Sequence, residues 1–462
     1  MNSKKILSLL LFTATVSAAF TGCGSISSDH SSNFSSNMTD GTSKTASSPS
    51  FVPSEDAGSK SLSIHFMTAR NETDAVIVSI EEIAKNYKNE NPDLDFTFEV
   101  ESIPDRTSYL QKLKILGASD ELPEWFDSDP DTWLANLGKG GKTYDINSLY
   151  DELGVQDKIF DISKNYAVMN DGSLYLITWQ CNAEYFFYHK NMFEAAGITE
   201  TPKTFDDLLD DCSKLRDAGY TPIGLGSDWP PLRYFAMIPF RMTGNEYIEQ
   251  AVSGKGSFGS EPGIKAAEFM QNIGQYYQMG WTTADTNTMD DLFTSGQTAM
   301  IYNGTWALPD MTDENKELTG DIGYFTMPIY SDSDVTKPTD YFANSGIGTA
   351  IRADAMTDQM KDFIKYVIDN YPKTAISHNQ IPSFKPDNET MSSLSTLYQD
   401  VISDIEGVNQ YAKCWDVVID SASVEPLEKE TTNLILGEKT PKEWAANMDQ
   451  IVADNLANAS IE

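Results

Sequence analysis

The pattern of residues 62–100 constrains the fold more than any other part of the sequence. Apolar and polar residues alternate over 62–66 and again over 94–100, as in half-buried strands. Between these segments, apolar residues recur at helical spacing over 76–87 and stop at Asn91-Pro92. A strand, a helix and a second strand in this order predict a right-handed crossover with the two strands parallel. The N-terminal part of the body is therefore predicted to be α/β.

Similar patterns continue along the chain and predict a mixed α/β protein throughout. We expect Thr204 to cap the helix that begins at Phe205. Further strands are predicted at 123–126, 172–179, 185–188, 222–225 and 298–302, and further helices at 109–116, 190–196, 205–218, 264–279 and 289–294. Asn303 to Trp306, after the last of these strands, are predicted to form a loop.

The first sixty residues predict export. Lys4 and Lys5 precede a short apolar run that ends at Thr21-Gly22-Cys23, a pattern typical of a secretory signal, here assigned to 1–22. Cys23 after a small residue favours lipidation, although Phe20 departs from the usual motif; the alternative is cleavage near Ala18 or Ala19, which would leave Cys23 as a plain thiol.

A Ser-rich segment follows this N-terminus. Residues 23–60 contain few apolar side chains and are predicted to be a disordered tether, because such a sequence cannot bury enough surface to offset its ordering entropy. A lipid on Cys23 would then place the folded body outside the cell, held at the membrane by this anchor alone.

Length and charge limit what the remaining chain can be. About 400 of the 462 residues follow the tether, which is too long for one compact core and suits two lobes. The sequence has 33 Lys and Arg against 69 Asp and Glu, a formal net charge of −36. Such an acidic chain is not expected to bind nucleic acid or anionic lipid through its surface.

The cysteines outside the N-terminus do not form a recognisable framework. Cys212 lies on a helical apolar stripe and is interpreted as a small core residue. Cys181 and Cys414 remain, and the sequence leaves open whether they pair.

Motifs for common enzyme chemistries are missing from the sequence. There is no nucleophile elbow, no phosphate-binding glycine loop and no pair of histidines at metal-ligand spacing. Asp127, Asp129 and Asp131 imitate the start of a calcium loop, but Thr132 stands where that loop needs glycine. We therefore expect no metal, no cofactor and no catalysis. The alternative is a secreted glycan-active enzyme that uses Asp127 and Asp129 as an acid/base pair.

Several tryptophans stand beside planar polar side chains, the combination that sugars require. Trp179 lies near Asn182, Trp229 follows Asp228, and Trp306 follows Asn303. Aromatic rings can stack on the apolar face of a sugar while amides and carboxylates bind its hydroxyls. Core packing is the alternative for each tryptophan. It is favoured for Trp444, which shares a helical stripe with Met448, Ile451 and Val452.

Five motifs, in order, resemble the carbohydrate-type extracellular solute-binding lipoproteins of ABC importers, relatives of maltose-binding protein. They are Asp-Gly-Ser-Leu-Tyr at 171–175, an aromatic-Lys-Asn…Ala-Gly segment at 185–197, Pro-Lys-Thr-Phe-Asp-Asp-Leu at 202–208, Phe-x-x-Gly-x-x-Ala-Met…Gly-Thr-Trp at 293–306, and Gly-Glu-Lys-Thr-Pro-Lys-Glu at 437–443. The sequence departs from the family pattern at His189 and Phe205, which are expected to be packing positions.

The resemblance implies a two-lobed periplasmic-binding-protein-like fold with hinge strands and a ligand cleft between the lobes. The N-terminal lobe would comprise 61–177 and 329–380, and the C-terminal lobe 178–328 and 381–462. The chain would cross between them near Ile177, Met327-Pro328 and Ile381-Pro382.

By the same resemblance, Trp306 would stack on a sugar, and closure of the lobes would deliver the sugar to an ABC permease. The protein would act as a monomer. Other ligand-contacting residues are expected from their positions alone: Asn71, Asp127, Asp129, Trp179, Asn182, Trp229, Asn303, Asn344 and Trp415. Neither the identity nor the length of the sugar follows from these residues.

Overall fold

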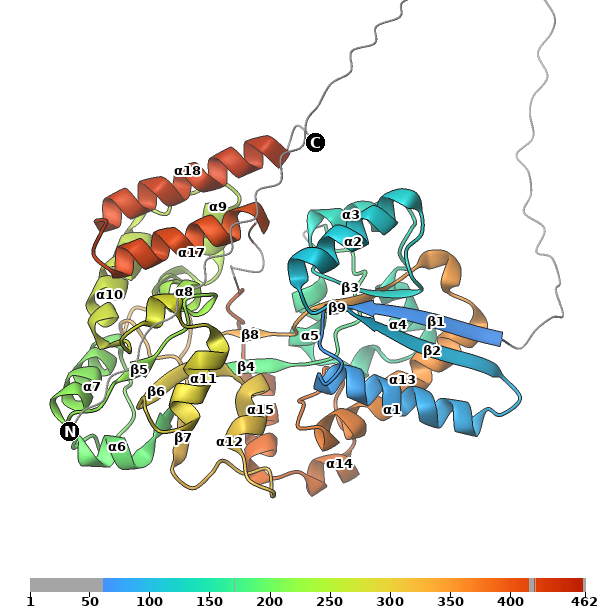
Figure 1. Ribbon diagram of the computed structural model, residues 1–462, viewed down its shortest axis with the longest axis horizontal. Coiled ribbons are helices and arrows are strands. Elements are labelled where there is room, and N and C mark those ends of the chain that lie inside the picture. Colours follow the sequence, from blue (N-terminus) through green and yellow to red (C-terminus); the bar gives the residue numbers. More distant parts are fainter. Residues whose placement is uncertain (1–60, 170, 415–418, 420, 460–462) are drawn as a thin grey trace, which may run out of the picture. The chain divides into compact units, whose positions relative to one another are not determined.

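The computed structural model of the protein describes residues 61–169, 171–414, 419 and 421–459 (Figure 1). The predicted signal at 1–22, the lipidation residue Cys23, the tether at 23–60 and the candidate ligand residue Trp415 lie outside the described residues. Among the described helices, none is long and apolar enough to cross a membrane.

The first sheet confirms the predicted βαβ unit. Its order is β2-β1-β3-β9. Strand β1 (Ser61–Thr68) pairs in parallel with β2 (Asp95–Ser102) and with β3 (Trp125–Ser128), and β9 (Gly348–Ile351) is antiparallel to β3. Helix α1 (Ala75–Glu90) connects β1 to β2 and packs against α13 (Asp358–Ser377). The buried apolar side chains of β1 share one hydrophobic core with α1, which the pattern predicted, and with α13, which it did not.

The second sheet lies farther along the chain and has the order β5-β6-β4-β7. Strand β4 (Asn182–His189) is central. It pairs antiparallel with β6 (Met300–Gly304), β7 (Ile322–Phe325) and the two-residue β8 (Ala343–Asn344). Strand β5 (Ile223–Gly224) is parallel to β6. Helix α7 (Phe205–Asp217) begins with a capping box in which Thr204 accepts from the Asp207 amide, as predicted.

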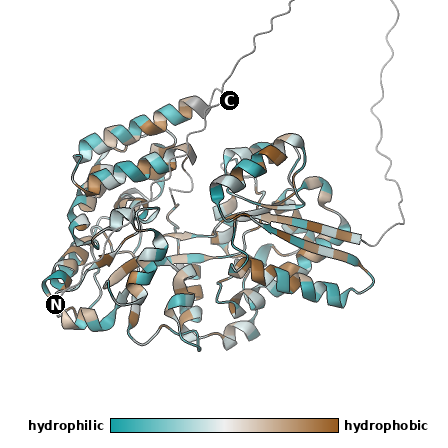
Figure 2. Cartoon of the chain, in the orientation of Figure 1, coloured by the Kyte–Doolittle hydropathy of each residue, from teal (hydrophilic) through white to brown (hydrophobic). Residues whose placement is uncertain are grey.

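Helices α8 (Pro230–Thr243), α10 (Glu261–Ile273), α17 (Ser421–Ile435) and α18 (Pro441–Ala459) pack together beside this second sheet. Trp444 is buried among them, as its helical stripe predicted. Hydrophobic residues of α18 alternate with hydrophilic ones along the helix (Figure 2). The other helices are α2 (Arg106–Ser119), α3 (Thr132–Lys139), α4 (Ile146–Leu153), α5 (Asp161–Ala167), α6 (Lys190–Ala195), α9 (Glu246–Val252), α11 (Thr286–Thr294), α12 (Leu308–Met311), α14 (Asn388–Ser393) and α15 (Thr396–Gly407).

Within the described residues, the chain passes between the two sheets at three places. Ile177 bridges to Thr349 of the first sheet and Asn182 begins β4, so residues 178–181 form one crossing. Residues 345–347 join β8 to β9 and form the second. The third lies at 381–384, because Ile381 belongs to the core beside β4 and Phe384 to the core of the first sheet.

The second crossing differs from the expected one at Met327-Pro328. Arg241 of α8 donates from Nη2 to the Met327 carbonyl at 2.5 Å and from Nε to the Pro328 carbonyl at 2.9 Å. It also donates to the Asp340 carbonyl at 2.8 Å. These bonds hold 327–340 beside the second sheet, so the segment 329–344 does not join the first sheet.

Two local predictions are also wrong. Residues 172–179 form isolated bridges instead of a strand, because the segment pairs only at single points, Leu174 with Val168 and Ile177 with Thr349. Asn303 and Gly304 are the last residues of β6 and are fully buried there, instead of forming a loop.

Candidate functional site

Trp229 and Trp306 lie at the ends of neighbouring strands and form a pair of rings. Trp229 follows β5 and directly precedes helix α8, and Trp306 lies in the short 3-10 turn Thr305–Ala307 that follows β6. The ring centroids are 5.9 Å apart and the planes meet at 74°, an edge-to-face contact. Both residues are half-buried. The sequence predicted both as ligand residues, and the structure brings them together.

Gly304 allows the Trp306 ring to take this position. A side-chain carbon built on Gly304 would lie only 2.0 Å from the Trp306 ring, so the indole covers the glycine backbone. The backbone at Gly304 is extended, with φ of −104°. The glycine is therefore needed for close approach of the ring and not for an unusual backbone angle.

A buried ion pair supports Trp229. The guanidinium of Arg233, one helical turn later in α8, lies 5.3 Å from the centre of the Trp229 ring. Its Nε is 2.8 Å from Glu184 Oε2 of strand β4, and both side chains are at most 4% exposed. This pair fixes the start of α8 against the central strand of the second sheet. Arg233 and Glu184 were not predicted as site residues; the spacing of Trp229 and Arg233 on one helix face was the available signal.

Asn182 and Asn344, both predicted, lie side by side where the chain crosses between the sheets. Asn182 Nδ2 donates to Asn344 Oδ1 at 3.2 Å, and Asn344 Nδ2 donates to Glu184 Oε1 at 3.2 Å. Asn344 Oδ1 also accepts from the Gly346 amide at 3.1 Å. Both asparagines are at least nine-tenths buried. Their amides are engaged inside the protein and hold the crossing segments in register.

Asp127, at the end of β3, belongs to a buried network. Its Oδ1 accepts from Thr349 Oγ1 at 2.7 Å, and its Oδ2 accepts from the Thr68 hydroxyl and from Arg70 Nη1, the latter at 2.5 Å. Burial raises the pKa of the Asp127 carboxyl, and the Arg70 guanidinium and the two threonine hydroxyls oppose that rise. Arg70 also donates to the carbonyl of Ile347 in the second crossing.

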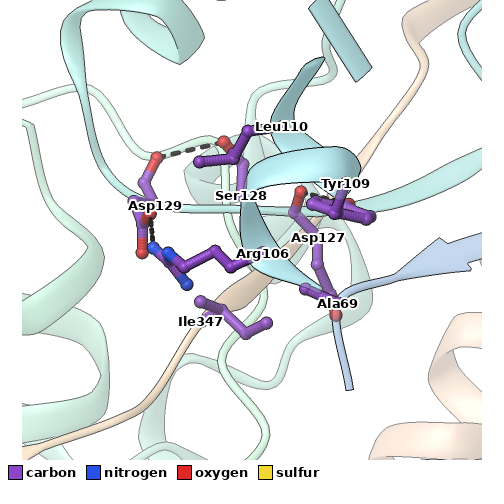
Figure 3. A pocket seen from close by; sticks show the side chains of 8 residues that line it. All are labelled: Ala69, Arg106, Tyr109, Leu110, Asp127, Ser128, Asp129 and Ile347. Carbon is purple, nitrogen blue, oxygen red and sulfur yellow. Dashed lines mark hydrogen bonds and ion pairs between the residues drawn. The ribbon is translucent and has the colours of Figure 1, made fainter. Parts of the chain in front are cut away.

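Asp129 lies two residues farther along, in a small pocket lined by Ala69, Arg106, Tyr109, Leu110, Asp127, Ser128, Asp129 and Ile347 (Figure 3). Arg106 points at Asp129 and forms an ion pair with it, and the Arg106 side chain is 53% exposed. Tyr109 donates to the Asp127 carbonyl at 2.6 Å. Asp129 is the one predicted carboxylate here whose partner still faces solvent. Arg70 and Arg106 were not predicted as site residues, because neither lies in a recognisable motif.

The remaining predicted residues do not join the tryptophan pair. Trp179 is fully buried, stacks on Trp125 with ring centroids 6.1 Å apart, and donates from Nε1 to Thr349 Oγ1 at 2.7 Å. Its indole has no face open to a ligand, so Trp179 is left out of the candidate site. Asn303 is fully buried too, whereas Asn71 is exposed in the turn after Arg70.

Cysteines and carboxylates offer no further chemistry among the residues that the structure describes. Cys181, Cys212 and Cys414 are all buried, and Cys181 forms no disulfide bond, so it does not pair with Cys414. No cluster of three or more His, Cys, Asp or Glu in the described ranges could hold a metal ion. What this part of the chain offers is a half-buried aromatic pair beside the buried Arg233–Glu184 ion pair, an arrangement suited to stacking on a flat, hydroxylated ligand.

Comparison with known proteins identifies the family. Residues 73–370 match the family model described as bacterial extracellular solute-binding protein. The maltotriose-binding protein of Pyrococcus abyssi is 23% identical over 235 residues, 50% of this chain and 47% of that protein. The diacetylchitobiose-binding protein of Streptomyces coelicolor is 24% identical over 262 residues, 56% of this chain and 59% of that protein. The chain therefore covers only about half of the length of these curated relatives.

A solved structure shares the fold. A chitin oligosaccharide binding protein matches with a TM-score of 0.70 and 22% identity, over 86% of this chain and 98% of that one. This likeness confirms the predicted fold class, a two-lobed α/β solute-binding architecture.

Proposed function

From the premise that this chain belongs to the bacterial extracellular solute-binding protein family, we propose that it captures a sugar or oligosaccharide by closure of its two lobes. The single observation that carries the proposal is the edge-to-face pair of Trp229 and Trp306, half-exposed at adjoining strand ends. Relatives named for maltotriose, diacetylchitobiose and chitin oligosaccharides support the same ligand class. Contacts from both lobes would favour the closed state by their differential affinity.

The experiment is a calorimetric titration of the purified protein with maltotriose, diacetylchitobiose and longer chitin oligosaccharides, followed by mass spectrometry of each sugar. We expect at least one sugar to bind with a Kd on the order of micromolar, about −8 kcal/mol, and to be recovered intact. If neither these sugars nor a wider oligosaccharide panel binds, the proposed ligand class is wrong.

Catalysis is the competing function, and the surroundings of Asp127 argue against it. A general acid or nucleophile needs an oxygen that can reach the substrate, whereas both Asp127 oxygens already accept bonds inside a fully buried site. We propose that the protein binds without turnover. Hydrolysis of a bound sugar that Asp129→Asn abolishes would instead favour the enzyme.

Delivery and attachment are part of the same proposal. The captured sugar would pass to an ABC permease, and a lipid on Cys23 would hold the protein outside the membrane through the segment 23–60. Two signals support the anchor: the basic and apolar start of the sequence, and the small residue directly before Cys23. Cys23→Ser should move the protein from the membrane fraction to the medium, and unchanged membrane retention would exclude the anchor.

A further inference from the structure

Helix α11 contacts the segment that carries Trp229. Thr286, at the start of the helix, donates its hydroxyl to Asp228, the residue directly before Trp229, with Oγ1 2.7 and 2.8 Å from the two carboxylate oxygens. The Thr286 amide lies 3.4 Å from Asp228 Oδ2. Both polar groups of Thr286 therefore bind the same carboxylate and fix the chain next to the first ring.

One turn later, the same helix contacts the strand that leads to Trp306. Asn303 Nδ2 donates to Asp290 Oδ1 at 2.7 Å, and Asn303 Oδ1 accepts from the Gly304 amide at 2.8 Å. Asn303 is fully buried, and the Trp306 ring covers Gly304. A continuous set of contacts thus runs from the Asp290 carboxylate through Asn303 and Gly304 to the indole.

Positions 286 and 290 are four residues apart and lie on one face of the helix. We propose that α11 is a clamp that sets the relative position of Trp229 and Trp306, with Asp290 as the positioning residue for Trp306. This inference rests on the proposed function only in that the clamped rings would be the sugar-stacking surface. Asn303 was predicted to contact the ligand. In the clamp it instead connects Asp290 to Gly304 and so acts on the Trp306 ring indirectly.

The clamp is sensitive to pH near neutrality. Burial raises the pKa of Asp290 to about 7; the hydrogen bond from Asn303 lowers it, and the nearby carboxylates of Asp310, Asp291 and Asp228 raise it further. Asp310 lies in α12, Asp228 in the segment after β5, and Asp291 is the next residue of α11. The charged groups that act most on Asp290 are therefore all carboxylates. Above pH 7 the ionised carboxylate holds Asn303 through a charge-assisted bond, and below pH 7 protonation weakens that bond.

The test uses the full chain labelled with 5-fluorotryptophan and needs no sugar. Fluorine NMR signals of Trp229 and Trp306 are assigned with Trp229→Phe and Trp306→Phe, and the wild-type protein is titrated from pH 5 to pH 9. We expect the Trp306 signal to shift with a midpoint near pH 7. Asp290→Asn keeps an oxygen that can accept from Asn303 and cannot titrate, so this shift should disappear.

Two further variants separate positioning from a simple field effect. Asp291→Asn is the matched control: it neutralises the exposed next residue, leaves the Asn303 bond in place, and should keep the shift with a slightly lower midpoint. Asn303→Ala keeps Asp290 but removes the connection, so the Trp306 signal should stop following pH. A Trp306 signal that does not titrate, or that titrates equally in Asp290→Asn or Asn303→Ala, would overturn the clamp.

The consequence for binding is measured separately with maltotriose and diacetylchitobiose. For whichever of these binds, wild-type affinity should fall about tenfold from pH 8 to pH 5.5, the effect expected when a charge-assisted hydrogen bond is weakened. Asp290→Asn should flatten this profile, and an equal fall in the variant would contradict the clamp. If neither sugar binds but the fluorine titration behaves as expected, the clamp stands and the proposed ligand class fails.

Discussion

Side chains near the strand ends of the two sheets look equivalent in the sequence, but in the structure they differ in burial and in their internal partners. At the end of β3, Asp127 is fully buried and bonded to Thr68, Arg70 and Thr349. Beyond the ends of β5 and β6, Trp229 and Trp306 are only half-buried and contact each other. Position at a strand end predicts where a ligand crevice can lie. Whether a side chain is open to the ligand depends on the internal partners that it finds.

The largest effect in this comparison is expected from Asp127→Ala. Removing the nearer partner of a buried ion pair leaves the Arg70 guanidinium, at 5% exposure, with only the Asp74 carboxylate 3.9 Å from its Nε, and should lower the free energy of unfolding by about 3–5 kcal/mol in a urea titration. Asp129→Ala is the matched control, because its partner Arg106 is 53% exposed; it should cost about 1 kcal/mol or less. Similar small costs for both variants would show that Asp127 is not buried with its partner.

An intermediate effect is expected from Gly304→Ala. The new methyl group would lie 2.0 Å from the Trp306 ring and must displace it, an overpacking cost of about 1–3 kcal/mol. The displaced ring should weaken binding of a panel sugar by about tenfold or more. Gly320→Ala is the control, because a side-chain carbon there meets no atom within 4 Å. Unchanged sugar affinity in Gly304→Ala would show that binding does not depend on the position of the Trp306 ring.

A pH-dependent effect on stability is expected from Asp290→Asn. Because burial raises the pKa of Asp290 from its ordinary value to about 7, the folded protein holds a proton that the unfolded chain loses, and stability falls as pH rises towards 7. Asp290→Asn cannot titrate at this position, so it does not lose this stability as pH rises. Its Tm should exceed that of the wild type at pH 8, and the difference should shrink as pH falls below 7. A constant Tm difference from pH 5 to pH 8 would contradict the raised pKa.

Much of the fold follows from periodicity, and its failures have physical causes. The βαβ unit over 61–102 was predictable because each strand has one buried face and α1 has a clear apolar stripe. Residues 172–179 look like a strand by composition, yet their apolar side chains fill the core of the first sheet while the backbone pairs only at single points, Leu174 with Val168 and Ile177 with Thr349. The second crossing escaped prediction because Arg241 binds distant carbonyls that no local pattern reveals.

The candidate site was only partly predictable for a similar reason. Trp229 and Trp306 could be identified because each stands in a short segment that follows a predicted strand, beside planar polar residues. Trp179 has similar neighbours in sequence, but Trp125 and Thr349 enclose its indole. The contacts of Arg233, Glu184 and Asp290 join elements that are separated in the sequence, and a single sequence does not reveal such contacts.

The central claim is that Trp306 faces a ligand whereas Trp179 belongs to the core. The most direct test measures sugar affinity and ligand-free Tm for Trp306→Ala and Trp179→Ala in parallel. We predict that Trp306→Ala loses about 2–4 kcal/mol of binding, roughly 30- to 1000-fold, with a nearly unchanged Tm. Trp179→Ala should lose about 3–5 kcal/mol of stability. Trp306→Ala that binds the sugar as tightly as the wild type, with a collapsed Tm, would contradict the account.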